Sequence, residues 1–169
     1  MNLVIRAERP GDEREIAELI IAAFEDLPYS SHTEHLIVDA LRAQGQLAVS
    51  LVADDDGEII GHVAASPVLI SDGSAGWYGI GPVSVWPSCQ GRGIGSQLMR
   101  EALAVLQRLG AQGCVLLGDP DFYGRFGFVA ETGLVLPGVP AEYFQVMVFI
   151  GDCPVGEVSY SSAFSVGPA

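Results

Sequence analysis

The sequence predicts one mixed α/β domain of the α+β type. The chain has 169 residues, which is close to the size of one domain. Hydrophobic residues make up 49% of it and charged residues 17%, a composition that supports a buried core and argues against disorder. Segments with helical and with strand-like hydrophobic spacing alternate, and no repeat, linker or low-complexity stretch separates them. Residues 1–169 are therefore expected to form a single domain.

The first 45 residues predict a short strand and two amphipathic helices. Leu3–Arg6 has the character of a strand. The first helix begins after Pro10-Gly11-Asp12 and ends before Pro28, and its apolar residues recur with helical spacing (Ile16, Leu19, Ile20, Ala23 and Phe24). The second spans about Thr33–Ala43 and ends at Gly45, with four inward-facing residues (Leu36, Ile37, Ala40 and Leu41).

Three strands joined by tight turns are predicted next. They are Leu47–Ala53, Ile59–Ile70 and Trp77–Trp86. The turns lie at Asp55-Asp56-Gly57 and at Ser71–Gly76, where glycine and aspartate favour chain reversal.

The rest of the chain predicts one long helix, one short helix and several strands. The long helix covers about Ile94–Leu109 and is closed by Gly110; its apolar face consists of six residues (Ile94, Leu98, Ala102, Val105, Leu106 and Leu109). The short helix starts at Asp119-Pro120, an N-cap followed by proline, and stops near Gly127. The strands are Cys114–Leu117, Phe128–Ala130, Tyr143–Ile150 and a last one within Gly156–Phe164.

The charge balance excludes several classes of function. The net charge is −13, and all eight cations are arginine. Without lysine there is no Walker A loop and no Schiff-base chemistry. Such an acidic chain is a poor partner for nucleic acid or for an anionic membrane, so neither is expected.

Three cysteines without close pairs (Cys89, Cys114 and Cys153) indicate reduced thiols. The opening residues lack the apolar core of a signal peptide. We therefore expect a cytoplasmic protein. The sequence leaves open whether it is a monomer or a homodimer.

A glycine-rich loop is the most informative segment. After the strand that ends before Pro87 comes Gln90-Gly91-Arg92-Gly93-Ile94-Gly95-Ser96, followed by the long helix. Glycines let a ligand approach the backbone, and a helix start presents free N–H groups, so this loop suits a pyrophosphate. Residues 73–118 carry three arginines and one glutamate, a net charge of +2 in an otherwise acidic chain. The alternative is that the glycines only shape a strand-to-helix turn.

The Gln-x-x-Gly-x-Gly spacing of this loop resembles the coenzyme A signature of the GNAT N-acetyltransferase superfamily. A second element, Asp119-Pro-Asp-Phe-Tyr-Gly-Arg-Phe-Gly-Phe128, is similar to a Tyr-x-x-x-Gly-Phe motif of the same superfamily and places Tyr123. Val139-Pro-Ala-Glu-Tyr-Phe-Gln-Val and the later Ala163-Phe164 resemble the YhbS-like branch.

The resemblance implies a mixed, mostly antiparallel sheet of six or seven strands with splayed central strands and about four helices. It implies acetyl-CoA as cosubstrate, no metal, and direct attack of an amine on the thioester. Tyr123 would protonate the departing thiolate; as one more aromatic beside Phe122, Phe126 and Phe128 it could instead belong to the core. Cofactor contacts are expected from Val83, Ser84, Val85, Gln90, Gly91, Arg92, Gly93, Ile94, Gly95 and Ser96.

The chain departs from the superfamily at the general base. Many members carry a glutamate on the fourth strand, whereas Trp77–Trp86 contains none. Ser84 can position a water in its place; the other candidates are His62, Glu25, Asp26 and Glu142. A coenzyme A-binding sensor without turnover and a transferase of a bulkier acyl group stay open as alternatives.

The acceptor is expected to be an amine, on a small molecule or a protein, and cationic. Residues 8–58 contain thirteen acids against three arginines. A negative site raises the local concentration and association rate of a positive substrate. A solvated acidic face that only aids solubility is the alternative.

Overall fold

The computed structural model describes residues 2–166, and its centre is a seven-stranded sheet. The strand order is β1 (Leu3–Ala7), β2 (Val49–Asp55), β3 (Glu58–Pro67), β5 (Trp77–Val85), β6 (Gly113–Leu117), β9 (Phe144–Val148) and β7 (Val129–Ala130). Every neighbouring pair is antiparallel except β5 and β6, which are parallel. The predicted mixed, mostly antiparallel sheet is confirmed. Positions 1 and 167–169 of the predicted domain lie outside the described residues.

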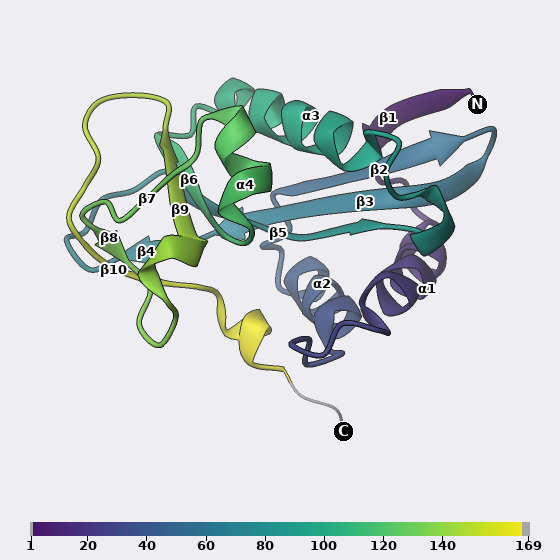
Figure 1. Cartoon of the computed structure of the whole chain (residues 1–169), viewed down its shortest axis with the longest axis horizontal. Coiled ribbons are helices and arrows are strands. Elements are labelled where there is room, and N and C mark those ends of the chain that lie inside the picture. Colours follow the sequence, from purple (N-terminus) through teal and green to yellow (C-terminus); the bar gives the residue numbers. More distant parts are fainter. Residues whose placement is uncertain (1, 167–169) are drawn as a thin grey trace.

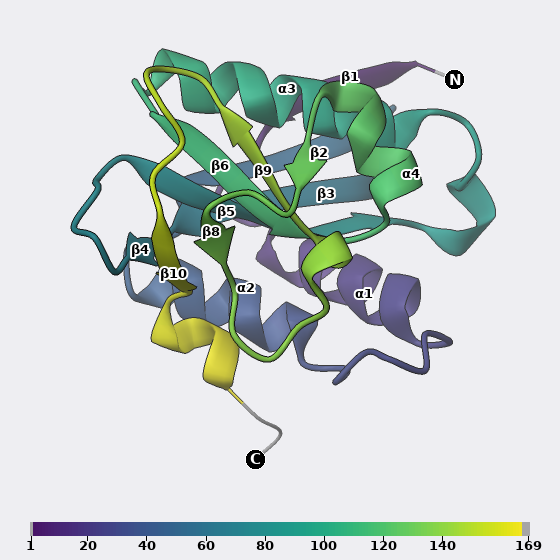
Figure 2. The ribbon, with the colours of Figure 1, turned by 60° about the vertical axis from the view of Figure 1, so that its left-hand side comes forward.

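Helices cover both faces of this sheet. α3 (Ile94–Arg108) lies on one face, and α1 (Glu13–Phe24) and α2 (Glu34–Ala43) lie on the other (Figures 1 and 2). A fourth, short helix, α4 (Pro120–Tyr123), follows β6. The four helices agree with the number expected. A separate three-stranded sheet is formed by β4 (Leu69–Ile70), β10 (Gly156–Ser159) and β8 (Leu134–Val135).

The hydrophobic spacing of each helix determines which side it buries. In α1 the predicted Ile16, Leu19 and Ile20 are buried and pack in one cluster with Val52 and Ala64 of the sheet. Burying each such side chain contributes about 1.5–3 kcal/mol. On the other face a Cβ at Gly61 of β3 would stand 3.0 Å from Leu98 and 3.1 Å from Ile94, so the missing side chain lets α3 lie close to the sheet.

The central strands diverge because β5 pairs with β6 over only three residues. Trp77, Tyr78 and Gly79 face Gly113–Val115. Beyond them β5 continues to pair with β3, with a register irregularity beside the cis Gly81–Pro82 peptide bond. From residue 81 onward, no strand among residues 2–166 pairs with the side of β5 that faces away from β3. The expected splay of the central strands is confirmed.

Some predicted boundaries were wrong. Ile59–Ile70 is not one strand: β3 ends at Pro67, and Leu69–Ile70 forms the separate strand β4, which pairs with β10 of the small sheet. Leu109 follows the last turn of α3 and is 55% exposed rather than on its buried face. β8 was not predicted, and the tail after β10 ends in a 3₁₀ helix at Ser162–Ser165.

Candidate active site

The loop between β5 and α3 has the backbone geometry of an anion site. Gly91 has φ = 81° and Gly93 has φ = 79°, values in the left-handed region that glycine adopts without strain. Gly93 is the N-cap of α3 and offers no side chain to its first turn. The first-turn amides, from Ile94 to Ser96, are therefore presented to an incoming ligand together with the positive end of the helix dipole.

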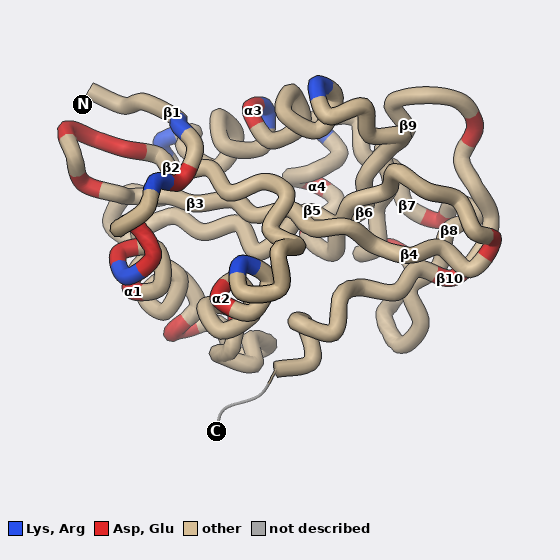
Figure 3. Tube along the Cα trace, turned by 180° about the vertical axis from the view of Figure 1, so that it is seen from behind, with Lys and Arg blue, Asp and Glu red and all other residues tan. Residues whose placement is uncertain are grey.

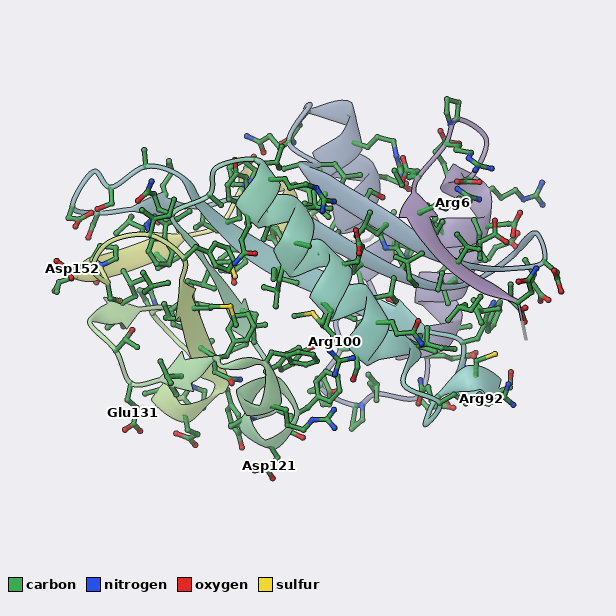
Figure 4. The ribbon with its side chains drawn as sticks, turned by 90° about the horizontal axis from the view of Figure 1, so that it is seen from above. Arg6, Arg92, Arg100, Asp121, Glu131 and Asp152 are labelled. Atoms are coloured by element: carbon green, nitrogen blue, oxygen red, sulfur yellow. The ribbon has the colours of Figure 1, made fainter. Side chains whose placement is uncertain are left out.

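The predicted Gln90 and Arg92 lie on the same loop. The Gln90 side-chain amide donates a hydrogen bond to the Val85 carbonyl at 3.1 Å and so ties the loop to the end of β5. Arg92 is exposed on the loop, and Arg100 extends from α3 toward α4 (Figure 4), with its guanidinium 5.6 Å from the centre of the Phe126 ring. Arg92 thus precedes the start of α3, and Arg100 lies in the N-terminal half of this helix.

Sequence reasoning missed a third cation, Arg125. It belongs to the 3₁₀ turn after α4, and its Nη2 donates a long, 3.5 Å hydrogen bond to the Ser96 hydroxyl on the first turn of α3. Its guanidinium also stacks 4.8 Å from the centre of the Phe122 ring. The signal was present in the sequence, because Arg125 lies within the Tyr123 motif, yet nothing local indicates that this motif reaches α3.

Three elements converge at the start of α3. A Cβ at Gly95 would stand 3.9 Å from both Phe122 of α4 and Val85 of β5. The structure thus brings together the predicted loop, the end of the predicted strand and the helix that carries Tyr123. Most of the predicted cofactor contacts therefore lie around one location.

Val83, Ser84 and Val85 form the segment of β5 that pairs with β3 on one side and with no described strand on the other. Val83 and Val85 pack into the cluster under α3. Ser84 alternates to the opposite face, is 2% exposed, and its hydroxyl has no hydrogen-bond partner among the described residues. The backbone of this segment is therefore free to pair with an extended ligand on the side away from β3.

Tyr123 ends α4, whose start is fixed by Asp119. The Asp119 carboxylate caps the helix by accepting from the Asp121 amide at 3.0 Å. The Tyr123 ring stacks edge-on against Phe122 and Phe128. Burial, with smaller contributions from Tyr29 and Asp119, raises the pKa of Tyr123 to about 12. The phenol therefore keeps its proton throughout the neutral range.

The contribution of Tyr29 relates the segment between α1 and α2 to Tyr123. Tyr29 belongs to this segment and is 82% exposed. Glu25 and Asp26 are exposed in the same segment, and the Glu25 carbonyl lies 3.2 Å from Nε2 of His32. This segment therefore carries two of the candidate bases that the sequence predicted, Glu25 and Asp26.

The other candidate bases lie in different surroundings. Glu142 is exposed in the turn before β9, whereas His62 is fully buried within β3. Among residues 2–166 no group of three or more His, Cys, Asp or Glu side chains is arranged to hold a metal ion. In the same residues no helix has both the length and the apolar character needed to cross a bilayer.

Residues 46–130, half of the chain, match the family model described as an acetyltransferase (GNAT) domain. The chain belongs to the GNAT acetyltransferase family. The matched stretch of this GNAT chain contains β5, the glycine loop, α3 and Tyr123, which are the elements that converge in space.

Relatives of this GNAT chain extend the similarity to nearly all of its length. The uncharacterized N-acetyltransferase YhbS of Escherichia coli (strain K12) is 40% identical over 127 residues, which is 75% of this chain and 73% of YhbS. The E. coli YhbS structure in complex with CoA has a TM-score of 0.89 at 34% identity, covering 98% of this chain and 93% of its own. A Brucella melitensis GNAT family acetyltransferase in complex with acetyl-CoA has a TM-score of 0.87 at 51% identity, covering 96% and 98%. The resemblance to the YhbS-like branch is confirmed.

Proposed function

We propose that this enzyme transfers the acetyl group of acetyl-CoA to an amine of a small molecule or a protein. The observation that carries the proposal is the uncapped start of α3, entered through left-handed Gly91 and Gly93 beside the unpaired side of β5. The helix start provides free amides for a pyrophosphate, and the unpaired side of β5 provides backbone groups for an extended arm attached to it. The acetyl-CoA and CoA bound to the two similar structures support the same donor.

The donor would be held by backbone and arginine groups without a metal. The pyrophosphate accepts from the amides of Ile94, Gly95 and Ser96, and Arg92 and Arg125 neutralise its charge. The pantetheine arm lies along Val83–Val85 and pairs with their backbone groups. Each amide hydrogen bond to a charged phosphate is worth about 1.5–3 kcal/mol.

Tyr123 would act as the general acid. The amine lone pair forms the new C–N bond, the C–S bond breaks, and the phenol proton passes to the CoA sulfur. Burial raises the pKa of Tyr123 to about 12. It disfavours a thiolate in the same way, as the raised pKa of buried Cys114 illustrates. The pKa of the phenol that gives the proton and the pKa of the thiol that forms are therefore raised together inside the site.

Ser84 would receive the amine on the opposite side of the thioester. Its buried hydroxyl has no partner among residues 2–166, so its donor and acceptor capacity is free for the nucleophile or for a water beside it. A primary amine, with a pKa of about 10.4, must lose a proton before it can attack the thioester. This loss costs about 4–5 kcal/mol at pH 7. A hydroxyl at this position gives that proton a first acceptor.

The acceptor would be cationic. Acidic residues gather along α1 and the β2–β3 turn (Figure 3), but five acids in this half of the chain are paired with arginine (Glu8, Asp12, Glu18, Asp39 and Asp54). Glu25 and Asp26 belong to none of these pairs, and they lie in the same segment as Tyr29, whose phenol contributes to the raised pKa of Tyr123. These two carboxylates, rather than the whole acidic half, are the groups that would attract a positive amine.

Release of the free CoA thiol from acetyl-CoA, measured against a panel of cationic, neutral and anionic amines, tests the proposal. We expect turnover with at least one amine and an N-acetylated product by mass spectrometry. Binding of acetyl-CoA by calorimetry without turnover on any amine would favour the non-catalytic sensor. Turnover with a bulkier acyl-CoA but not with acetyl-CoA would replace the donor.

A further inference from the structure

Four polar side chains form a row across four strands on the sheet face that α1 and α2 cover. They are Glu8, directly after β1, Ser50 on β2, His62 on β3 and Ser84 on β5. His62 and Ser84 are direct partners in the β3–β5 register, and Ser50 lies diagonally across from His62. The inner members have apolar neighbours, because Val52 and Ala64 on the same strands as Ser50 and His62 pack against α1. Polar groups in such a place are retained at a cost.

The hydrogen bonds in this row determine where the protons are. Glu8 accepts from the Ser50 hydroxyl at 2.7 Å, and Ser50 lies 2.9 Å from Nε2 of His62. A hydroxyl has one proton, and Ser50 gives it to the carboxylate. Nε2 of His62 must therefore carry the proton in the second bond. Burial lowers the pKa of His62 to about 4, so the ring is neutral at pH 7 and its Nδ1 is a free acceptor.

The inner end of the row is incomplete in a specific way. Nδ1 of His62 and the Ser84 hydroxyl are both fully buried, and neither has a hydrogen-bond partner among the described residues. Directly opposed residues on paired strands have Cβ atoms about 4.5–5.5 Å apart. To complete the row, a rotation of the Ser84 side chain or one bridging water would have to link these two atoms. Ser84 also belongs to the segment of β5 that flanks the unpaired edge.

We propose that this row is the path by which the proton of the attacking amine leaves the active site. The inference rests on the proposed function. Before the N–C bond forms, the proton that the bound ammonium must lose passes to the Ser84 oxygen while the Ser84 proton passes to Nδ1 of His62. The Nε2 proton passes to Ser50, the Ser50 proton passes to Glu8, and Glu8 releases it to water. Each member of the row gains and loses one proton. The CoA sulfur takes its proton from Tyr123, and the proton that the nitrogen loses as the amide forms goes to water, from which the phenol is restored.

The outer end of the row is Glu8, which can release a proton to solvent. Arg42 of α2 binds the Glu8 carboxylate with two hydrogen bonds of 2.9 and 2.7 Å. Burial acts to raise the pKa of Glu8, but hydrogen bonds from Arg42 and Ser50 outweigh it and hold this pKa below its usual value. Glu8 and Arg42 are the charged groups that act on His62. Glu8 therefore stays ionised, accepts a proton only transiently and passes it to solvent through its partly exposed side.

The path is tested by Ser84→Ala, Ser50→Ala and His62→Gln, each of which interrupts it at a different member. We expect kcat at pH 7 to fall about 10²-fold, because proton transfer by a positioned group contributes at least that much. The deficit should shrink at pH 9.5, where more of the amine is already deprotonated in solution. Acetyl-CoA affinity should stay unchanged. Combining Ser84→Ala with Ser50→Ala should be no worse than either alone, since one broken member stops the path.

Ser66→Ala is the matched control. Ser66 lies on the same strand as His62, is as fully buried, and its hydroxyl also has no partner among residues 2–166. It lies outside the row, so its variant should keep the wild-type kcat at every pH. Two outcomes would overturn the path and make the row only structural. One is a loss of kcat in the row variants that is equal at pH 7 and 9.5. The other is a loss of kcat in Ser66→Ala as large as theirs.

The failure of the path is distinguishable from the failure of the proposed function. Wild-type protein that acetylates no amine refutes the function, and the path with it. An active wild type with unaffected Ser84→Ala and Ser50→Ala variants refutes the path alone. Nitrogen-15 NMR of His62 gives a readout without turnover: we expect the neutral Nε2–H tautomer at pH 7, and the Nδ1–H tautomer would overturn the proposal, because Nδ1 could then accept nothing from Ser84.

Discussion

The ring of Tyr123 occupies the space in which a side chain at Gly118 would lie. A Cβ built on Gly118 would stand 2.9 Å from Cδ2 of Tyr123 and nearer still to Cε2. Gly118 directly follows β6, and its amide donates to the Tyr143 carbonyl while its carbonyl accepts from the Gln145 side chain. The backbone at Gly118 is therefore fixed, and it determines where the phenol lies.

Gly118→Ala should accordingly displace the phenol and lower kcat. Because the anchored backbone cannot move away, the ring must, and a misplacement of about 1 Å can cost 10²-fold in rate. Steady-state kinetics and acetyl-CoA calorimetry measure the two effects separately. Gly124→Ala is the control, since Gly124 has ordinary helical dihedral angles and nothing within 4 Å of its built Cβ. A full-rate Gly118→Ala would mean that the position of Tyr123 is unimportant.

Tyr123→Phe tests the general acid directly. The variant keeps the packing against Phe122 and Phe128 and removes only the hydroxyl. We expect turnover to fall about 10²–10⁴-fold with acetyl-CoA affinity nearly intact. An unchanged rate would return Tyr123 to the aromatic core. Equal losses of rate and affinity would mean that the phenol shapes the donor site instead.

Gly93→Asp should abolish acetyl-CoA binding. The change adds a side chain and a negative charge at the N-cap of α3, where the proposed pyrophosphate lies. Gly45→Asp is the matched control: Gly45 has φ = 69°, also has nothing within 4 Å of its built Cβ, and follows α2, which covers the opposite sheet face from α3. Calorimetry should give wild-type affinity for Gly45→Asp. Wild-type affinity for Gly93→Asp would place the phosphates elsewhere.

The buried imidazole of His62 predicts a loss of stability on acidification. Burial lowers the pKa of His62 to about 4 from 6.5, so between these values the unfolded chain binds a proton that the folded chain does not. The free energy of unfolding should therefore decrease by about 2 kcal/mol from pH 7 to pH 4.5 through this residue. The lowered pKa values of Glu8, Asp12 and Asp54 also remove stability on acidification, but mostly below pH 4.5, because the ordinary values of these carboxyls are 4.5 and 3.8.

Urea denaturation of the wild type and His62→Gln at pH 7.0, 5.5 and 4.5 measures this contribution. The variant should be less stable at pH 7 but lose about 2 kcal/mol less on acidification. His35→Gln, which removes a partly exposed imidazole of α2, should keep the wild-type pH dependence. The same slope in all three proteins would mean that His62 is not held neutral by the fold.

The sequence predicted the features whose signal is contiguous. The glycine loop, its helix and Tyr123 each lie within one short segment, and backbone conformation there follows from glycine, proline and the N-cap. The partnership of His62 with Ser84 and Ser50 depends on strand register, which no local pattern contains. Arg125 was missed for a related reason, because its contact with Ser96 joins residues 29 positions apart.

The cationic acceptor can be tested by removing the two carboxylates beside Tyr29. Glu25→Gln combined with Asp26→Asn should lower kcat/KM for a polyamine or a lysine-like amine several-fold at low salt and leave kcat nearly unchanged. Both carboxylates are exposed, so their effect is on encounter and is weakened once the Debye length falls to about 8 Å at physiological salt. The variant and the wild type should therefore converge as salt is added.

The control for this pair removes the same charge at a distance. Asp152→Asn combined with Glu157→Gln changes two exposed acids, and Figure 4 shows Asp152 at the end of the molecule away from Arg92. If net charge alone attracts the amine, both double variants lose rate equally. If Glu25 and Asp26 attract it locally, only their variant does. A neutral amine that outcompetes every cationic one, or a kcat/KM for cationic amines that salt leaves unchanged, would refute the attraction while leaving the acetyl transfer itself untouched.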